Sequence, residues 1–184
     1  MSVVAEPYGT FRVEDLENPG VPEKFVEIIE GELVVMTPAG QFHNRIGYRF
    51  QRLFDTYCED RLNLNFGGDN EGFVLKRDPD LLLSPDASLF RRRDHEPNPW
   101  MEFAPEICVE ILSPSNSPSE IAYKRSRYFE FGADQVWIVD PDEKSIDFYF
   151  QDGRRVTVRG EETVRGEGLA EGMRIDLVPL FKPA

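Results

Sequence analysis

The stretch that decides the fold is EICVEILSPSNSPSEIAYKRSRYFEFGADQVWIVDP, residues 106–141. It begins with an apolar run at 106–112 and ends with another at 135–140, and both have the length of buried strands. Between them, Ser117-Pro118-Ser119-Glu120 is typical of a helix start, because serine caps, proline suits the first position and glutamate follows three residues after the cap. Gly132 ends that helix. A strand, a helix and a strand in this order predict a right-handed parallel crossover.

The pattern around this unit predicts further strands and one long helix. Apolar residues spaced by three and four predict an amphipathic helix over 39–59. Short strands are predicted at 25–30, 32–36, 62–66, 72–75, 85–90, 145–150 and 154–159. A chain of 184 residues is long enough for one well-packed domain and short for two. We therefore expect a single α/β domain, residues 1–184, in which the long helix and the shorter crossover helix cover a mixed sheet.

The composition excludes several classes of function. The chain has 21 basic and 34 acidic residues, and a net charge of −13 repels a phosphate backbone unless basic residues gather locally. No apolar run approaches the roughly 20 residues that span a bilayer, and no signal peptide is visible. Two cysteines and two histidines are too few for a disulfide scaffold or a histidine-rich metal centre. We expect a reduced, cytoplasmic protein without a membrane partner.

Glu110 is the most informative candidate for chemistry. It lies in ICVEIL, a strand that is apolar on both faces, and shares one face with Cys108 and Leu112. A carboxylate buried there must be paired, protonated or bound to a cation, although a strand-end carboxylate held by an arginine or water is equally consistent. Asp86 begins PDASLF and can point to the same place if the two strands are neighbours, although Pro-Asp is also ordinary turn chemistry. Two convergent carboxylates suit Mg²⁺.

Lys124 adds a positive charge near this pair. It lies in the second turn of the helix after Glu110, and its long side chain can reach back toward the strand end. There it would orient a water and stabilise charge on a phosphoryl group. With Arg125 and Arg127, it also fits a solvated basic face.

The remaining candidates have ordinary explanations. Arg45, Arg49 and Arg52 share one helix face and can contact phosphates, or can pair with the acidic residues that continue that face. His43, near the start of that helix, can donate to a phosphate or be structural. Glu32, just after a predicted hairpin turn, is unremarkable by itself.

An ordered set of motifs nevertheless resembles a known family. EGELVVMTPAG followed by His43, then SPDASLF, EICVEILSPSNS and YKRSRYFEFGADQVWIVDP, is similar to the Uma-type restriction endonucleases, a branch of the PD-(D/E)xK nuclease superfamily. The similarity runs from about Phe25 to the C-terminal DLVPLF. It implies a restriction-endonuclease-like core.

The resemblance also implies roles for individual residues. Asp86 matches the aspartate of the PD motif, and Glu110 matches the acidic residue of (D/E)xK. Leu112 occupies the place of the superfamily lysine, whereas the Uma-type pattern places a lysine on the following helix, where Lys124 lies. Glu32 matches the acidic residue of an early GE motif that assists metal binding. His43 matches a histidine common in the family's first long helix.

The function implied is metal-dependent hydrolysis of DNA phosphodiester bonds. Asp86, Glu110 and Glu32 would hold Mg²⁺, for which Mn²⁺ can substitute, and Lys124 would orient the attacking water. DNA is then the partner, and a homodimer is expected to help an acidic chain bind it. Two alternatives remain open, and both fit the acidic surface. One is a nuclease-fold protein that binds nucleic acid or a protein without catalysis. The other is a metal-dependent hydrolase of a small phosphorylated substrate.

Overall fold

The computed structural model describes residues 2–4 (backbone only), 10–22, 25–38, 40–68, 71–93 and 100–183, so that His95 lies outside the described part. The helices are α1 (Gln41–Cys58), α2 (Pro118–Glu130) and α3 (Leu177–Leu180), with 3-10 turns η1 (Val13–Glu17) and η2 (Gly168–Ala170). The strands are β1 (Ser2–Val4), β2 (Val26–Ile29), β3 (Glu32–Val35), β4 (Leu64–Gly67), β5 (Phe73–Lys76), β6 (Leu81–Leu83), β7 (Ala87–Arg91), β8 (Ile107–Ile111), β9 (Gln135–Asp140), β10 (Ser145–Phe150), β11 (Arg155–Arg159), β12 (Thr163–Arg165) and β13 (Arg174–Asp176).

The expected parallel crossover is the centre of the molecule. β8 and β9 pair in parallel, from Ile107 opposite Gln135 to Ile111 opposite Val139, and α2 connects them. The Ser117 side chain accepts a hydrogen bond from the Glu120 backbone N–H at 3.1 Å, as the capping pattern predicts. The α/β class and the mixed sheet are therefore confirmed.

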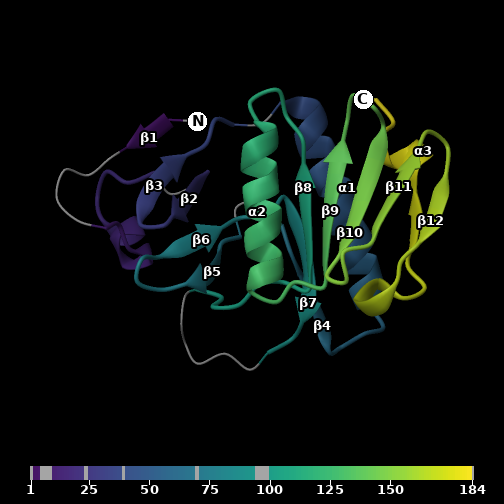
Figure 1. Cartoon of the computed structure of the whole chain (residues 1–184). Coiled ribbons are helices and arrows are strands. Elements are labelled where there is room, and N and C mark those ends of the chain that lie inside the picture. Colours follow the sequence, from purple (N-terminus) through teal and green to yellow (C-terminus); the bar gives the residue numbers. More distant parts are fainter. Residues whose placement is uncertain are drawn as a thin grey trace.

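A six-stranded sheet, in the order β11-β10-β9-β8-β7-β4, lies between the two long helices (Figure 1). On one face, Ile107 and Val109 of β8 belong to the same buried cluster as Phe50 of α1. On the other face, Cys108 lies in a second cluster with Tyr128 of α2. Glu110 shares the face of Cys108, because side chains alternate along a strand, and so it points toward α2.

The structure adds two sheets to the one that was predicted, and the smaller is the pair β12-β13. The hairpin of β2 and β3 is present, but it belongs to a five-stranded sheet of order β1-β3-β2-β6-β5 (Figure 1). The strand β6, which joins the hairpin to β5, is only Leu81-Leu82-Leu83 and is too short to show alternation in the sequence. In the described part of the chain, no helix is long and apolar enough to cross a membrane.

Candidate active site

Asp86 and Glu110 meet where two neighbouring strands end. Asp86 immediately precedes β7, and its backbone N–H donates to the Val109 carbonyl at 2.9 Å. The N–H of Ile111, the last residue of β8, donates to Oδ2 of Asp86 at 2.6 Å. The antiparallel register that pairs Ala87 with Val109 therefore continues to Asp86 and Glu110. The convergence that the sequence left conditional is present in the structure.

Lys124 joins Glu110 to a carboxylate from the other sheet. Its Nζ lies 3.0 Å from Oε2 of Glu110 and 2.9 Å from Oε1 of Glu27 on β2. All three side chains are buried, so the pairs lie in a region that screens charge poorly. The alternative in which Lys124 is part of a solvated basic face is thereby excluded.

Glu110 is held on both of its oxygens. Oε2 accepts from Lys124, and Oε1 accepts from the Tyr128 hydroxyl at 2.6 Å. Burial raises the pKa of Glu110 to about 7; the nearby Asp86 and Glu27 carboxylates also raise it, while Lys124 and the Tyr128 hydrogen bond oppose the shift. The Lys124 ammonium stays charged, because the attraction of Glu110 and Glu27 outweighs the cost of burial and raises its pKa. A carboxyl group that titrates near neutral pH in a cleft is typical of functional sites.

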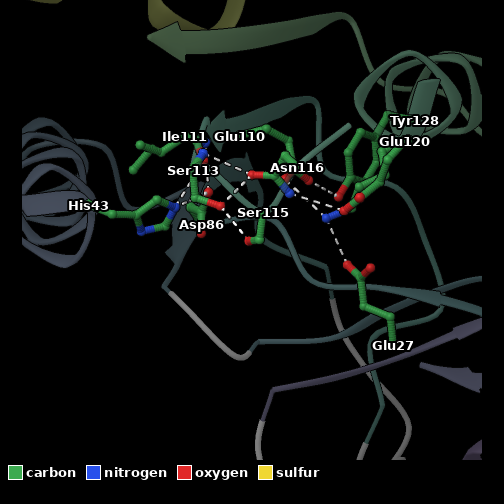
Figure 2. Close-up of polar contacts among 11 residues, drawn as sticks. Glu27, His43, Asp86, Glu110, Ile111, Ser113, Ser115, Asn116, Glu120 and Tyr128 are labelled. Atoms are coloured by element: carbon green, nitrogen blue, oxygen red, sulfur yellow. Dashed lines mark hydrogen bonds and ion pairs between the residues drawn. The ribbon is translucent and has the colours of Figure 1, made fainter. Parts of the chain in front are cut away.

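His43 contacts the same strand end from α1. Its Nε2 lies 2.9 Å from the Ile111 carbonyl oxygen and 3.4 Å from Oδ2 of Asp86 (Figure 2). A proton on Nε2 can be donated to that carbonyl, which fixes how the ring lies beside Asp86. The histidine thus contacts both the backbone of β8 and one of the two carboxylates.

A cavity opens in front of these groups. Asp86, Glu110, Lys124 and His43 line it, together with Phe25, Met36, Thr37, Ser84, Ile111, Ser113, Ser115, Asn116 and Glu120. Its volume of about 70 Å³ has room for a few waters or a phosphate group, and is well below the size of ordinary small-molecule sites. Thr37 and Ser115 at its edge are exposed, so the cavity is accessible to a larger substrate from outside.

Three predicted residues lie elsewhere. Glu32 is exposed at the start of β3, opposite Ile29, and is not among the residues that line the cavity. Arg49 donates from Nη1 to the carbonyl oxygens of Leu180 and Lys182, each at 2.7 Å, and so ties the C-terminal segment to α1. Arg45 lies on α1 beside Arg49 and lines a surface hollow that shares no residue with the cavity.

Glu27 and Tyr128 were not predicted, although the sequence holds a signal for each. Glu27 stands in VEII as Glu110 stands in VEIL, and in both places a glutamate interrupts an apolar strand. Such a residue needs a buried partner, and Lys124 serves both glutamates. Tyr128 follows Lys124 by four residues, which places the two on one face of α2.

The number of acidic side chains at the cavity decides which kind of metal site could form there. In the described ranges, no three His, Cys, Asp or Glu side chains gather closely enough to form a metal cluster. Mg²⁺, however, is commonly held by one or two carboxylates together with waters and substrate phosphates. Asp86 and Glu110 supply two such carboxylates at one cavity, and the donor set of this site therefore suits the ion.

Comparisons with known proteins agree with this fold. A crystal structure of a putative nuclease belonging to DUF820 from Anabaena variabilis ATCC 29413 superposes with a TM-score of 0.77 at 20% identity, over 91% of this chain and 95% of that one. No curated protein matches the chain. A family model described as "Uma2: Putative restriction endonuclease" matches residues 13–178, which is most of the chain. The resemblance noted in the sequence is confirmed, and the chain belongs to the Uma2 family.

Proposed function

We propose that the protein is a metal-dependent endonuclease that hydrolyses DNA phosphodiester bonds at the cavity of Asp86, Glu110 and Lys124. The single observation that carries this proposal is the meeting of these three side chains at one cavity. The family description supports nuclease activity in general. The metal and the DNA substrate rest on the chemistry of the side chains.

Each residue has a distinct part in this proposal. Asp86 and Glu110 would hold Mg²⁺ or Mn²⁺, and the bound ion would supply an acidified water and charge stabilisation at the phosphate. Lys124 supplies a fixed positive charge beside Glu110, toward which a phosphate oxygen or the attacking water can be oriented. His43 keeps the Ile111 carbonyl and Asp86 in place through its Nε2 contacts.

Glu27 replaces Glu32 as the third acidic residue in this proposal. It does not line the cavity, and it pairs with the same Lys124 Nζ as Glu110 does. When Glu110 turns toward a cation, Lys124 keeps a buried counterion in Glu27. Glu27 is therefore proposed to position Lys124 and not to bind the ion.

Incubation of supercoiled circular DNA with Mg²⁺ or Mn²⁺, beside an identical reaction with chelator, tests the proposal. We expect nicked circles that need the metal and that are lost in Asp86→Asn. A single cavity cuts one strand at a time, so the expected homodimer would also produce linear DNA. Cleavage that persists in chelator, or in Asp86→Asn at the wild-type rate, would overturn the assignment.

Binding without catalysis is the second candidate, and one observation favours it. Both oxygens of Glu110 already accept hydrogen bonds, from Lys124 and Tyr128, which leaves less of the carboxylate for an ion. A protein of this kind would bind DNA in chelator and in Mg²⁺ alike, with no strand scission in either. The volume of the cavity does not exclude the small-substrate alternative, because there is room for a phosphate group.

A further inference from the structure

The exposed side of α1 continues the surface of the cavity. A second hollow shares His43 and Asp86 with the cavity and is also lined by Asn44, Tyr48 and Gln51. A third hollow shares Asn44 and Tyr48 with the second. Because neighbouring hollows have lining residues in common, they follow one another and together make up a depression that leads from Asp86 along α1. We call this depression the α1 track.

The α1 track is basic on a strongly acidic chain. Residues 41–54 contain three arginines and no aspartate or glutamate, while the whole chain carries −13. Arg45 and Arg52 line the third hollow with Arg49 between them. Burial, and then the charge of Arg45, lower the pKa of Arg49, so Arg45 and Arg49 lie close enough to repel one another. A bound anion would relieve that repulsion, and arginine and amide side chains are the usual partners of phosphate oxygens.

Tyr48 lies at the middle of the α1 track and is one of the few large hydrophobic side chains exposed among the described residues. Its exposed fraction is 59%, and it lines both the second and the third hollow. An exposed aromatic ring among arginines is what proteins use to stack unpaired bases. A duplex keeps its bases stacked on one another, so this ring favours a single strand over a duplex.

We propose that the α1 track binds an unpaired DNA strand, with Arg45 and Arg52 on its phosphates, Tyr48 against a base, and the strand leading to Asp86. This rests on the proposed function for the identity of the ligand. The charge complementarity and the lining residues shared with the cavity are independent of catalysis. The preferred substrate is then DNA with a single-stranded segment at the cleavage point.

Fluorescence anisotropy with a labelled single-stranded oligonucleotide, and with the matching duplex, tests the proposal in chelator, where no cleavage can occur. We expect the single strand to bind more tightly than the duplex. Tyr48→Ala should weaken single-strand binding about ten-fold, while Tyr48→Phe should keep it. Arg45→Gln and Arg52→Gln should each lower the slope of log affinity against log salt by about 0.7.

Arg159→Gln is the matched control, because it removes the same charge from an exposed position on β11. β11 and β4 form opposite edges of the six-stranded sheet, and α1 packs against β4. Arg159→Gln should leave the salt slope unchanged. Equal binding by Tyr48→Ala and wild type, a preference for the duplex, or no binding at low salt would each overturn the proposal. If the strand binds as expected but is never cleaved with Mg²⁺ or Mn²⁺, the proposed nuclease function fails and the α1 track stands.

Discussion

Oε1 of Glu27 on β2 lies 2.9 Å from Nζ of Lys124 on α2, and both side chains are buried. The same glutamate oxygen accepts the Ser84 backbone N–H at 3.0 Å. The pair connects the five-stranded sheet to the helix that covers the six-stranded sheet (Figure 1). One lysine thus links the two halves of the fold and also supplies the positive charge at the cavity.

Neutralising Glu27 should therefore lower both stability and activity. Glu27→Gln removes one of the two counterions of a buried lysine, and we expect the free energy of unfolding to fall by about 3 kcal/mol. Urea denaturation measures this. Glu32→Gln is the matched control, because Glu32 is exposed on the adjacent strand, and should stay within about 0.5 kcal/mol of wild type. A larger loss for Glu32→Gln than for Glu27→Gln would reverse the assignment of the two glutamates.

Metal binding should depend on pH through Glu110. Because burial raises the pKa of this carboxyl to about 7, it is largely protonated at pH 6 and ionised at pH 8. A cation binds the ionised form, so we expect Mn²⁺ affinity, measured by calorimetry on the uncleaved protein, to fall about ten-fold per pH unit below pH 7 and to level off above it. An affinity that is constant from pH 5 to pH 8 would show that Glu110 is not the titrating ligand.

Glu110 should also make folding stability pH-dependent, with the opposite sense to an ordinary paired carboxylate. Between its unfolded value of 4.5 and its folded pKa of about 7, the folded state holds the proton that the unfolded chain has released. The contribution of Glu110 to the free energy of unfolding therefore decreases as pH rises through that window, and is constant above it. Urea denaturation of Glu110→Gln should lack this component, and an identical slope in both proteins would contradict it.

Tyr128→Phe should shift the pH dependence of metal binding. The Tyr128 hydroxyl donates to Oε1 of Glu110, and this hydrogen bond lowers the pKa of Glu110. Its loss should move the midpoint of Mn²⁺ binding to higher pH and destabilise the fold by about 1–3 kcal/mol. Tyr57→Phe is the control, since the Tyr57 hydroxyl donates to the Leu169 and Glu171 carbonyls. Tyr57→Phe should lower the free energy of unfolding without moving the pH midpoint of Mn²⁺ binding. A shift of that midpoint in both variants would indicate a general structural effect.

Local signals explain how much of the fold could be predicted. Residues 106–141 contain a cap, a helix end and two apolar runs, and the structure has the crossover at those positions. The five-stranded sheet could not be predicted in full, because its pairing of Ile28 with Leu82 joins segments that are far apart in the chain. The local pattern of apolar residues does not reveal which distant strand a segment pairs with.

The candidate site, like the fold, could be predicted only in part. Asp86 and Glu110 could be placed together because each lies at the end of a recognisable strand. Glu32 was predicted because it matches the motif, and Glu27 was not predicted; the fold turns Glu27 inward and leaves Glu32 exposed. The buried lysine that makes Glu27 necessary lies 97 residues further along the chain, and only the folded structure brings the two together.

The most direct test of the central claim is the rate at which Glu110→Gln nicks supercoiled DNA at saturating Mg²⁺, with Glu32→Gln measured beside it. Denaturation curves of both variants first establish that they are folded. If Asp86, Glu110 and Lys124 form the active site, Glu110→Gln should lose at least about 100-fold in rate and Glu32→Gln should match wild type. Wild-type nicking by a folded Glu110→Gln would contradict the account.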